Sequence, residues 1–281
     1  MSENIAAKSG TLDVGDMPVH RMGFGAMRIT GEGIWGPPKD AEVAKAVLRR
    51  AIELGVNLID TADAYGPEVS ENLIAESLHP YPADLVVATK GGLTRSGPGR
   101  WDPDCSPGHL REALDASLRR LRVDRVDLYQ LHTVDSKVPY EESIGTLKEL
   151  QEAGKIRHIG LCNVSVANLK TAREMVDVVS VQNRYNLSDR ASEKVLDACD
   201  EAGIAFIPWF PLASGGLAGQ KLEEVAARNA VTPMQVGLAW LLHRSKVMLP
   251  IPGTSSIAHL EENVAASEIQ LSDEDLAELD G

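Results

Sequence analysis

The stretch VNLIDTADAYG, residues 56–66, determines how we interpret the rest of this 281-residue chain. It opens with a short apolar run, residues 56–59, that follows the turn signal Leu54-Gly55, which is typical of a buried strand entered from a helix. The run ends on the carboxylate of Asp60, and Tyr65 follows five residues later in a polar loop. We therefore expect Asp60 and Tyr65 to face one pocket at the C-terminal end of this strand.

Further apolar runs along the chain have the same design. They cover residues 85–89, 126–131, 158–162, 178–181, 205–208 and 247–252, and they end on Lys90-Gly91-Gly92, His132, Asn163, Gln182-Asn183, Trp209 and Gly253-Thr254-Ser255-Ser256. Helical patterns alternate with these runs, which indicates parallel strands joined by crossover helices. Polar groups that close successive strands suit a barrel whose active site lies at the C-terminal face of its strands. We predict an α/β fold, a (β/α)8 TIM barrel, as a single domain over residues 1–281.

The segments between the strands carry helix signals. Ser106-Pro107 is typical of an N-cap and first helical position, and Gly154 and Gly203 are typical of helix ends. The predicted helices cover residues 40–54, 68–78, 106–121, 140–153, 165–175, 190–202, 222–229, 232–243, 257–266 and 272–279, the first with Val43, Val47, Ala51 and Leu54 on one apolar face.

The N-terminal part of the chain predicts three further features. We expect a β-hairpin over residues 11–19, a first barrel strand over residues 21–27 and a loop without helical structure over residues 30–39. That loop is rich in Gly and Pro and carries Trp35. The Trp35 side chain is either packed on the surface or a wall of a substrate pocket, and both interpretations stay open.

Composition narrows the class of protein. The chain has 28 Lys plus Arg against 41 Asp plus Glu, a net charge of −13, which argues against sequence-independent binding of nucleic acid. Its three cysteines are widely spaced and odd in number, which favours a reducing compartment. The N-terminus has no apolar signal segment and no run of about 18 apolar residues appears, so we expect a cytoplasmic protein without a membrane span. His132 has no second ligand at metal-binding spacing, so we expect no metal.

The motifs at the strand ends resemble those of the aldo-keto reductase superfamily. The resemblance runs from about residue 10 to the C-terminus and rests on LIDTADAYG (58–66), VATKGG (87–92), DLYQLH (127–132), HIGLCN (158–163), VQNRYN (181–186), FIPWFPLASGG (206–216) and IPGTSSIAHLEEN (251–263). It implies an NAD(P)H-dependent enzyme that reduces small carbonyl compounds, on a barrel whose bottom is plugged by the N-terminal hairpin. It also identifies Asp60, Tyr65, Lys90 and His132 as a catalytic tetrad.

These four residue types suit carbonyl reduction. Tyr65 is the candidate general acid, and a nearby cation stabilises its phenolate and lowers its pKa from about 10. Lys90 can supply the cation, and Asp60 is then needed as an anionic partner because a buried Lys otherwise tends to lose its charge. His132 can donate a hydrogen bond to the substrate carbonyl oxygen, while C4 of the reduced nicotinamide supplies the hydride. The alternative for Asp60 and Lys90 is a purely structural ion pair.

The resemblance also assigns cofactor-binding residues. Asn163 and Gln182 hold the nicotinamide carboxamide, Trp209 stacks on the nicotinamide ring, and Cys162 stands where the family usually has Ser. Phosphate and adenine contacts fall on Pro211, Leu212, Ser214, Gly215, Gly253, Thr254, Ser255, Ser256, His259, Glu262 and Asn263. Many family members grip the 2′-phosphate of NADP with a Lys or Arg, where this chain has Gly253, Ser255 and His259. We expect NADP(H), with His259 adding charge when protonated, and NAD(H) is the alternative.

Shorter motifs refine the resemblance. GPPKD (36–40), FPL (210–212), TPMQVGLAWLL (232–242) and IPGTSSIAHL (251–260) resemble a bacterial branch that includes pyridoxal reductases. Pyridoxal is therefore one candidate substrate, alongside small or aromatic aldehydes and quinones. The alternative function is an NADP-binding regulatory subunit similar to the β subunits of voltage-gated potassium channels, which share the fold and retain the tetrad. Oligomeric state and reaction direction stay open.

Overall fold

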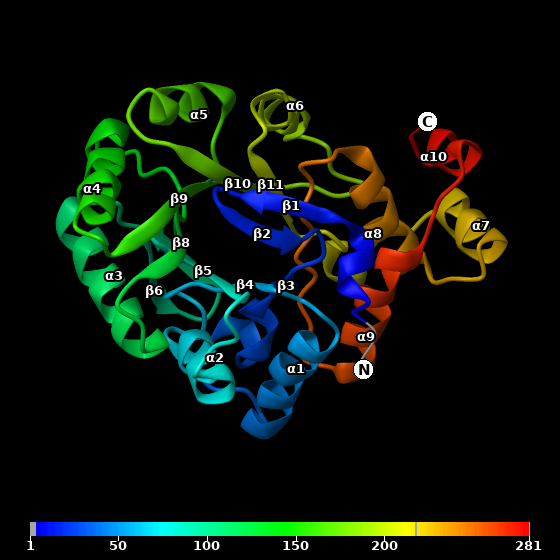
Figure 1. Ribbon diagram of the computed structural model, residues 1–281, viewed down its shortest axis with the longest axis horizontal. Helices are drawn as coiled ribbons and strands as arrows, with labels where there is room; N and C mark the ends of the chain where they lie inside the picture. The colour runs from blue at the N-terminus through cyan, green and yellow to red at the C-terminus, as the bar shows by residue number, and fades with distance from the viewer. Residues whose placement is uncertain (1–3, 217, 281) are drawn as a thin grey trace.

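The computed structural model describes residues 4–216 and 218–280, and its centre is a ring of parallel strands (Figure 1). Seven strands pair in the order β11-β10-β9-β8-β5-β4-β3. They are β3 (Phe24–Gly25), β4 (Leu58–Asp60), β5 (Val86–Gly91), β8 (Val126–Leu131), β9 (Ile156–Cys162), β10 (Val178–Arg184) and β11 (Ala205–Trp209). Each neighbouring pair is parallel, as the alternation of strands and helices predicts.

Residues 247–251 close the ring between its two edge strands. Phe206 of β11 makes two backbone hydrogen bonds to this segment, at 2.8 and 2.9 Å, and the N–H of Gly23 donates to the carbonyl of Pro250 at 3.0 Å. Proline has no N–H, so a segment that contains prolines forms isolated bridges rather than a regular ladder. The predicted strand over residues 247–252 is therefore irregular, while the predicted (β/α)8 barrel is confirmed.

Helices cover the outside of this ring. They are α1 (Ala41–Glu53), α2 (Val69–Leu78), α3 (Pro107–Leu121), α4 (Tyr140–Glu152), α5 (Val166–Arg173), α6 (Glu193–Ala202), α7 (Gln220–Arg228), α8 (Pro233–Arg244), α9 (Ile257–Ala265) and α10 (Asp273–Asp280). The side chains of Ser106, Ser165 and Thr232 cap α3, α5 and α8, as residues of these types are expected to do.

The apolar face predicted for α1 was wrong at one residue. Val43 is 44 % exposed, because the helix turns a neighbouring face toward the barrel. The buried residues on that face are Ala44, Val47, Leu48 and Ala51.

Two antiparallel hairpins accompany the ring. β1 (Thr11–Val14) pairs with β2 (Met17–His20), which confirms the predicted N-terminal hairpin. β6 (Leu93–Gly97) pairs with β7 (Arg100–Pro103) soon after β5, and the sequence analysis missed this hairpin. The Pro98-Gly99 turn between its strands is the signal that could have revealed it.

Short 3₁₀ helices replace two of the predicted features near the N-terminus. Within residues 21–27 only β3 is a strand, because η2 (Ala26–Ile29) follows it at once. Within residues 30–39 a 3₁₀ turn, η3 (Glu32–Ile34), appears where we expected no helical structure. Directly after the second turn, Trp35 forms a bridge with Gly66 in the turn that follows β4.

Strand periodicity decides which side chains enter the barrel. The inner residues of the lower barrel pack against the hairpin in one buried cluster, which includes Leu58, Ala88 and Leu128 with Val14, Met17 and Val19. Figure 1 shows this hairpin lying across the middle of the ring of helices. Two residues further along the same three strands come Asp60, Lys90 and Gln130. Because side chains alternate with a period of two, these polar groups lie on the same inner side, above the plug.

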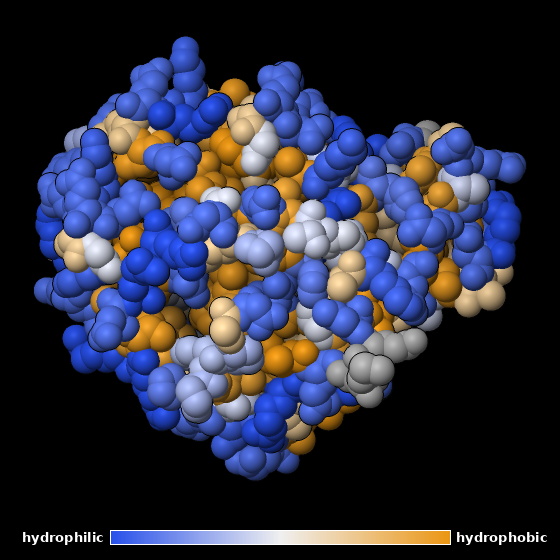
Figure 2. All heavy atoms as spheres, in the orientation of Figure 1, coloured by the Kyte–Doolittle hydropathy of each residue, from blue (hydrophilic) through white to orange (hydrophobic). Residues whose placement is uncertain are grey.

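The outer surface is largely polar. Figure 2 shows charged and polar side chains over most of one face, with apolar side chains in the grooves between them. Helices α7 and α10 lie side by side at one edge of the molecule (Figure 1), where Arg228 pairs with Asp275 at 2.6 Å and with Glu278 at 2.8 Å. Within the two described ranges, no helix has both the length and the apolar character needed to cross a membrane.

Candidate active site

Four side chains from three neighbouring strands meet at the C-terminal end of the barrel. Asp60 is the last residue of β4, Lys90 lies in β5 and His132 directly follows β8, while Tyr65 comes from the turn after β4. Each is buried, with an exposed fraction of 6 % or less. The structure thus brings together the four residues that the sequence analysis singled out, and their catalytic roles stay a prediction.

Lys90 is the centre of this group. Its Nζ donates to Asp60 Oδ1 at 2.6 Å, to the carbonyl oxygen of Thr61 at 2.8 Å and to the Tyr65 hydroxyl oxygen at 3.1 Å. An ammonium has three N–H donors, so all of them are used. Because the Tyr65 oxygen accepts from Lys90, the proton of the Tyr65 hydroxyl is left to donate to another acceptor.

The second oxygen of Asp60 is held by two amides that enter the barrel from other strands. Gln130 Nε2 donates to Asp60 Oδ2 at 2.9 Å and Gln182 Nε2 donates to it at 2.8 Å. The Cys162 thiol in turn donates to Gln130 Oε1 at 3.7 Å. The sequence analysis missed Gln130, whose signal was a polar residue at an inner position of an otherwise apolar strand. With both oxygens engaged, Asp60 has one orientation.

Burial and the interaction between the two groups determine the pKa values of Lys90 and Tyr65. Burial alone would lower the pKa of Lys90, but the charge of Asp60 and the hydroxyl of Tyr65 outweigh it and hold that pKa above its ordinary value. Burial raises the pKa of Tyr65 to about 12, although Lys90 acts to lower it. Our expectation that the cation would bring this pKa below its ordinary value was therefore wrong for the protein alone, because desolvation is the larger effect and Asp60 adds to it.

His132 faces Tyr65 as a neutral ring. The two ring centroids lie 5.8 Å apart at an interplanar angle of 78°, and His132 Nδ1 is a buried atom without a hydrogen-bond partner in the described chain. Burial, and secondarily the charge of Lys90, keeps the pKa of His132 well below its usual range. A neutral imidazole carries one N–H donor, so His132 can donate to a carbonyl oxygen without a charge of its own.

The residues expected to hold the nicotinamide contact one another. Asn163 Nδ2 donates to the His132 carbonyl at 3.0 Å, and Asn163 Oδ1 accepts from Trp209 Nε1 at 2.9 Å. An amide has two N–H groups and two lone pairs, so Asn163 keeps one of each for a carboxamide. Gln182 gives its nitrogen to Asp60, which leaves its oxygen for that role. The Cys162 thiol donates to Gln130 rather than to a group in the expected nicotinamide site. The cofactor-binding roles of all these residues stay predictions.

A sequence model of the aldo/keto reductase family matches residues 21–281. The chain belongs to the aldo/keto reductase family. This membership confirms the resemblance drawn from the strand-end motifs, and with it the prediction of an NAD(P)H-dependent oxidoreductase enzyme.

Curated relatives of this aldo/keto reductase cover nearly its whole length. An uncharacterised oxidoreductase of Schizosaccharomyces pombe is 54 % identical over 277 residues, which cover 98 % of this chain and 90 % of the relative. Pyridoxine 4-dehydrogenase of Escherichia coli is 46 % identical over 282 residues, which cover 97 % of this chain and 98 % of the relative. Among solved structures, an aldo/keto reductase from Klebsiella pneumoniae in complex with NADP and acetate has a TM-score of 0.78 at 26 % identity, and covers 94 % and 91 % of the two chains.

The expected phosphate segments of this aldo/keto reductase lie at the same end of the barrel as the tetrad. Gly253 packs so closely on the first strand that a Cβ there would lie 2.4 Å from the Gly25 carbonyl oxygen, so only glycine fits. Thr254 Oγ1 accepts from the Ser256 amide at 3.0 Å, and Ser256 caps α9. Ser255 is exposed. This glycine-cradled loop with hydroxyl donors fits a phosphate.

The remaining predicted contacts have mixed surroundings. His259 is exposed one turn into α9, and Asn263 is buried in the same helix. Glu262 accepts from the Thr232 hydroxyl at 2.6 Å, so part of its hydrogen-bonding capacity belongs to the start of α8. In the pyrophosphate loop, Pro211 is buried, Leu212 is partly buried and Gly215 has a φ of 81°, while the Ser214 side chain lies outside the described part of the structure.

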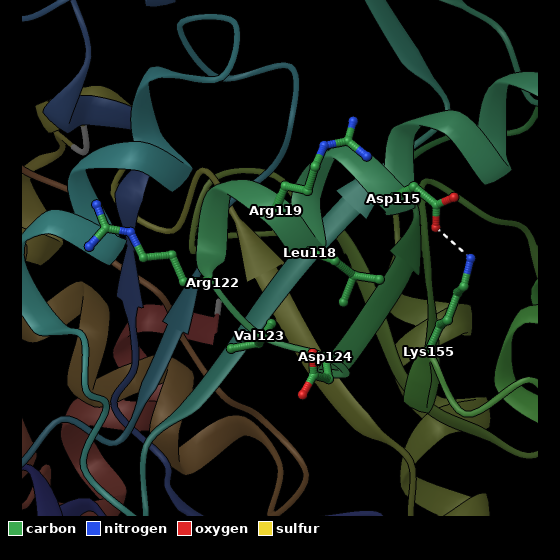
Figure 3. A pocket seen from close by; sticks show the side chains of 7 residues that line it. All are labelled: Asp115, Leu118, Arg119, Arg122, Val123, Asp124 and Lys155. Atoms are coloured by element: carbon green, nitrogen blue, oxygen red, sulfur yellow. Dashed lines mark hydrogen bonds and ion pairs between the residues drawn. The ribbon is translucent and has the colours of Figure 1, made fainter.

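A separate hollow lies at the other end of the barrel. It has a volume of about 440 Å³ and is lined by Asp115, Leu118, Arg119, Arg122, Val123, Asp124 and Lys155 (Figure 3). Asp124 precedes the start of β8, whereas His132 follows its end, so this hollow belongs to the face opposite the tetrad. Lys155 and Asp115 form an ion pair at 2.6 Å across it. Among the described residues, no group of three or more His, Cys, Asp or Glu is placed to bind a metal.

Proposed function

We propose that this aldo/keto reductase reduces an aldehyde or ketone to an alcohol, with Tyr65 as the general acid. The observation that carries the proposal is the hydrogen bond from Lys90 Nζ to the Tyr65 hydroxyl at 3.1 Å, in a site where Lys90 is also paired with Asp60. A pKa of about 12 keeps the Tyr65 proton in place at neutral pH. The alkoxide that forms on the substrate is a stronger base than a phenolate and takes that proton.

Each tetrad residue has a distinct task in this reaction. His132 donates its single N–H to the substrate carbonyl oxygen and holds that oxygen beside the Tyr65 hydroxyl. Tyr65 gives its proton to the same oxygen, and the ammonium of Lys90 stabilises the phenolate that remains. Asp60 keeps Lys90 charged and in place. A reduced nicotinamide bound at this end of the barrel supplies the hydride to the carbonyl carbon.

We infer that the cofactor is NADP(H). The Klebsiella pneumoniae relative binds NADP, and the loop of residues 253–256 offers hydroxyl donors at the start of α9. His259 is exposed one turn into α9, next to this loop. NAD(H) stays the alternative because no Lys or Arg occupies the predicted 2′-phosphate positions.

We infer that pyridoxal is one candidate substrate, and the name of one relative supports it. The Escherichia coli relative is named for the alcohol that corresponds to pyridoxal, and it matches 97 % of this chain. We further infer that the protein works in the cytoplasm and does not bind nucleic acid. Its three cysteines are free and buried, which suits a reducing compartment, and its net charge of −13 would repel a polyanion.

A substrate screen tests the proposal. Pyridoxal, 4-nitrobenzaldehyde and a short aliphatic aldehyde are each offered with NADPH and with NADH, and oxidation of the nicotinamide is followed by absorbance. Tyr65→Phe, which removes the proton donor and keeps the ring, is expected to lower kcat at least ~100-fold with little change in cofactor affinity. Near-normal turnover in that variant would exclude Tyr65 as the acid. Tight cofactor binding without turnover of any carbonyl would favour the regulatory-subunit alternative.

A further inference from the structure

Two tryptophans from different segments lie near Tyr65, one against its ring and one beside the residue that follows it. Trp101, in β7, lies edge-on to Tyr65 with ring centroids 6.3 Å apart and an interplanar angle of 83°. Trp35 follows η3 and forms a bridge with Gly66, the residue after Tyr65. Both tryptophan side chains are partly exposed, so each keeps surface that a ligand can contact.

Arg95, in β6, lies against both tryptophans. Its guanidinium carbon is 3.6 Å from the centroid of the Trp101 ring and 5.7 Å from that of Trp35. A guanidinium over an indole face is attracted by the negative potential of that face. Arg95 therefore fixes the plane of Trp101 and draws Trp35 toward the same place.

The hydrogen bonds of Arg95 join three segments of the chain. Its Nε donates to the carbonyl of Arg100 at 2.8 Å, which closes the β6–β7 hairpin. Its Nη1 donates to Ile34 and to Ala64, both at 3.0 Å, and its Nη2 donates to Gly33 at 3.2 Å. Ala64 immediately precedes Tyr65 in the chain. One side chain thus ties together the hairpin, the loop that carries Trp35 and the turn that carries the general acid.

The chemistry of these contacts distinguishes Arg95 from an ordinary surface arginine. Its acceptors are neutral backbone carbonyls, and its guanidinium also lies against aromatic rings, so it works here through its planar set of donors and its flat face. Burial lowers the pKa of Arg95, yet an arginine side chain stays protonated in proteins. A lysine could not supply the same four bonds and the same stacking.

We propose that Arg95 is a positioning residue that holds Trp101 and Trp35 as an aromatic wall beside Tyr65, and that this wall selects planar aromatic carbonyl substrates over short aliphatic ones. The inference rests on the proposed function, because it names the substrate class of the same site. An aromatic aldehyde can contact Trp101 with its ring while its carbonyl oxygen lies beside Tyr65 and His132. A two- or three-carbon aldehyde is too short to contact Trp101 while its carbonyl oxygen lies there. One aromatic pair corresponds to roughly a three- to tenfold change in affinity.

The first test replaces the wall itself. Trp101→Leu keeps an apolar side chain but removes the ring. We compare kcat/KM for 4-nitrobenzaldehyde and for propanal in wild type and variant, so that the intrinsic reactivities of the two aldehydes cancel. The aromatic-to-aliphatic ratio is expected to fall about three- to tenfold, mainly through KM of the aromatic aldehyde, while the dissociation constant for NADPH stays within about twofold. Trp35→Leu should change the ratio in the same direction.

The second test replaces the residue that holds the wall. Arg95→Met is compared with Arg100→Met, a matched control on the same hairpin, because Arg100 contributes its backbone carbonyl to the Arg95 contacts and that carbonyl is retained. Arg95→Met should lose the aromatic preference and also lower kcat for both aldehydes, since the turn before Tyr65 loses its anchor. Arg100→Met should match wild type in both respects. Thermal unfolding of each variant identifies any loss of folding, and the two tryptophan variants decide the matter if Arg95→Met does not fold.

Two results would overturn the inference. An unchanged ratio in both Trp101→Leu and Trp35→Leu would show that aromatic substrates do not use this wall. An equal loss of kcat/KM for both aldehydes in these variants would show that the wall supports the site without selecting aromatic substrates. If wild type turns over no carbonyl, the proposed function fails. The wall is then tested by calorimetric binding of 4-nitrobenzyl alcohol, which Trp101→Leu should still weaken about three- to tenfold.

Discussion

The buried ion pair between Lys90 and Asp60 yields the sharpest prediction, because the chain contains a matched exposed pair. Lys90 Nζ lies 2.6 Å from Asp60 Oδ1, with side-chain exposures of 0 % and 2 %. Lys155 Nζ lies 2.6 Å from Asp115 Oδ1, with exposures of 39 % and 42 %. The two pairs share residue types and distance and differ in burial. Asp60→Asn and Asp115→Asn therefore compare the same lost charge in the two environments.

The expected magnitudes follow from that difference. Removing one partner of a buried pair leaves an uncompensated charge and costs roughly 3–5 kcal/mol of unfolding free energy, whereas an exposed pair contributes about 1 kcal/mol or less. In Asp60→Asn the amide nitrogen also faces the Lys90 ammonium or the two glutamine amides, which are donors as well. We therefore expect Asp60→Asn to lower the urea midpoint strongly at neutral pH, and Asp115→Asn to lower it little.

The pH dependence gives a second signature with a definite sign. In wild type the pKa of Lys90 is raised, so the stabilisation from its charge is complete below its unfolded pKa and is lost only as pH rises through the higher folded pKa. In Asp60→Asn burial prevails, and the folded protein binds fewer protons than the unfolded chain. Its stability should then rise with pH by up to about 1.4 kcal/mol per unit between pH 7 and 9. Urea unfolding at both pH values measures this. A deficit equal to that of Asp115→Asn, or one that does not change with pH, would refute the reasoning.

Further predictions concern the cofactor and the histidines. Burial keeps the pKa of His132 far below its usual range, so the pH profile of kcat should show no step near pH 6.5. A step there that disappears in His132→Gln would contradict a neutral His132 ring. Cofactor binding should quench tryptophan fluorescence through Trp209, so a quench of full size in Trp209→Leu would place the stacking residue elsewhere. If residue 259 lies beside the 2′-phosphate, His259→Arg should tighten NADPH binding and leave NADH binding unchanged, and an equal change for both cofactors would remove residue 259 from the site.

The fold could be predicted from the sequence where local signals and packing agree. Strand β8 has the same bounds as the apolar run over residues 126–131. Helix α3 begins at Pro107 with Ser106 as its N-cap, as the Ser106-Pro107 pair predicts. Prediction failed where backbone chemistry intervenes. In residues 247–252, which close the barrel, the prolines prevent a regular ladder of hydrogen bonds. The first strand, β3, has only two residues because the 3₁₀ helix η2 follows it directly. Neither effect alters the hydrophobic pattern, so that pattern could not reveal them.

The site was predictable to the extent that its residues end strands. Asp60 ends β4, Lys90 is one residue from the end of β5 and His132 directly follows β8, and the structure brings all three together with Tyr65. The residues that were missed reach the site differently. Gln130 contacts Asp60 only because of the register between their strands. That register cannot be predicted without knowing which strands are neighbours. Arg95 reaches it through long-range contacts between loops, and no local spacing encodes those.

Strand register also separates the two aspartates of LIDTADAYG. Side chains of β5 alternate, so Lys90 points inward to Asp60, while the preceding Thr89 points outward and bonds the buried carboxylate of Glu71 at 2.6 Å. Asp63 lies partly buried on that outer side, where desolvation, reinforced by the charge of Glu71, raises its pKa to about 8. A neutral carboxyl there could not hold the charge of a buried lysine. The carboxylate that keeps Lys90 charged is therefore Asp60. A shift of one residue in β5 would turn Lys90 to the outer side and leave Tyr65 without its cation.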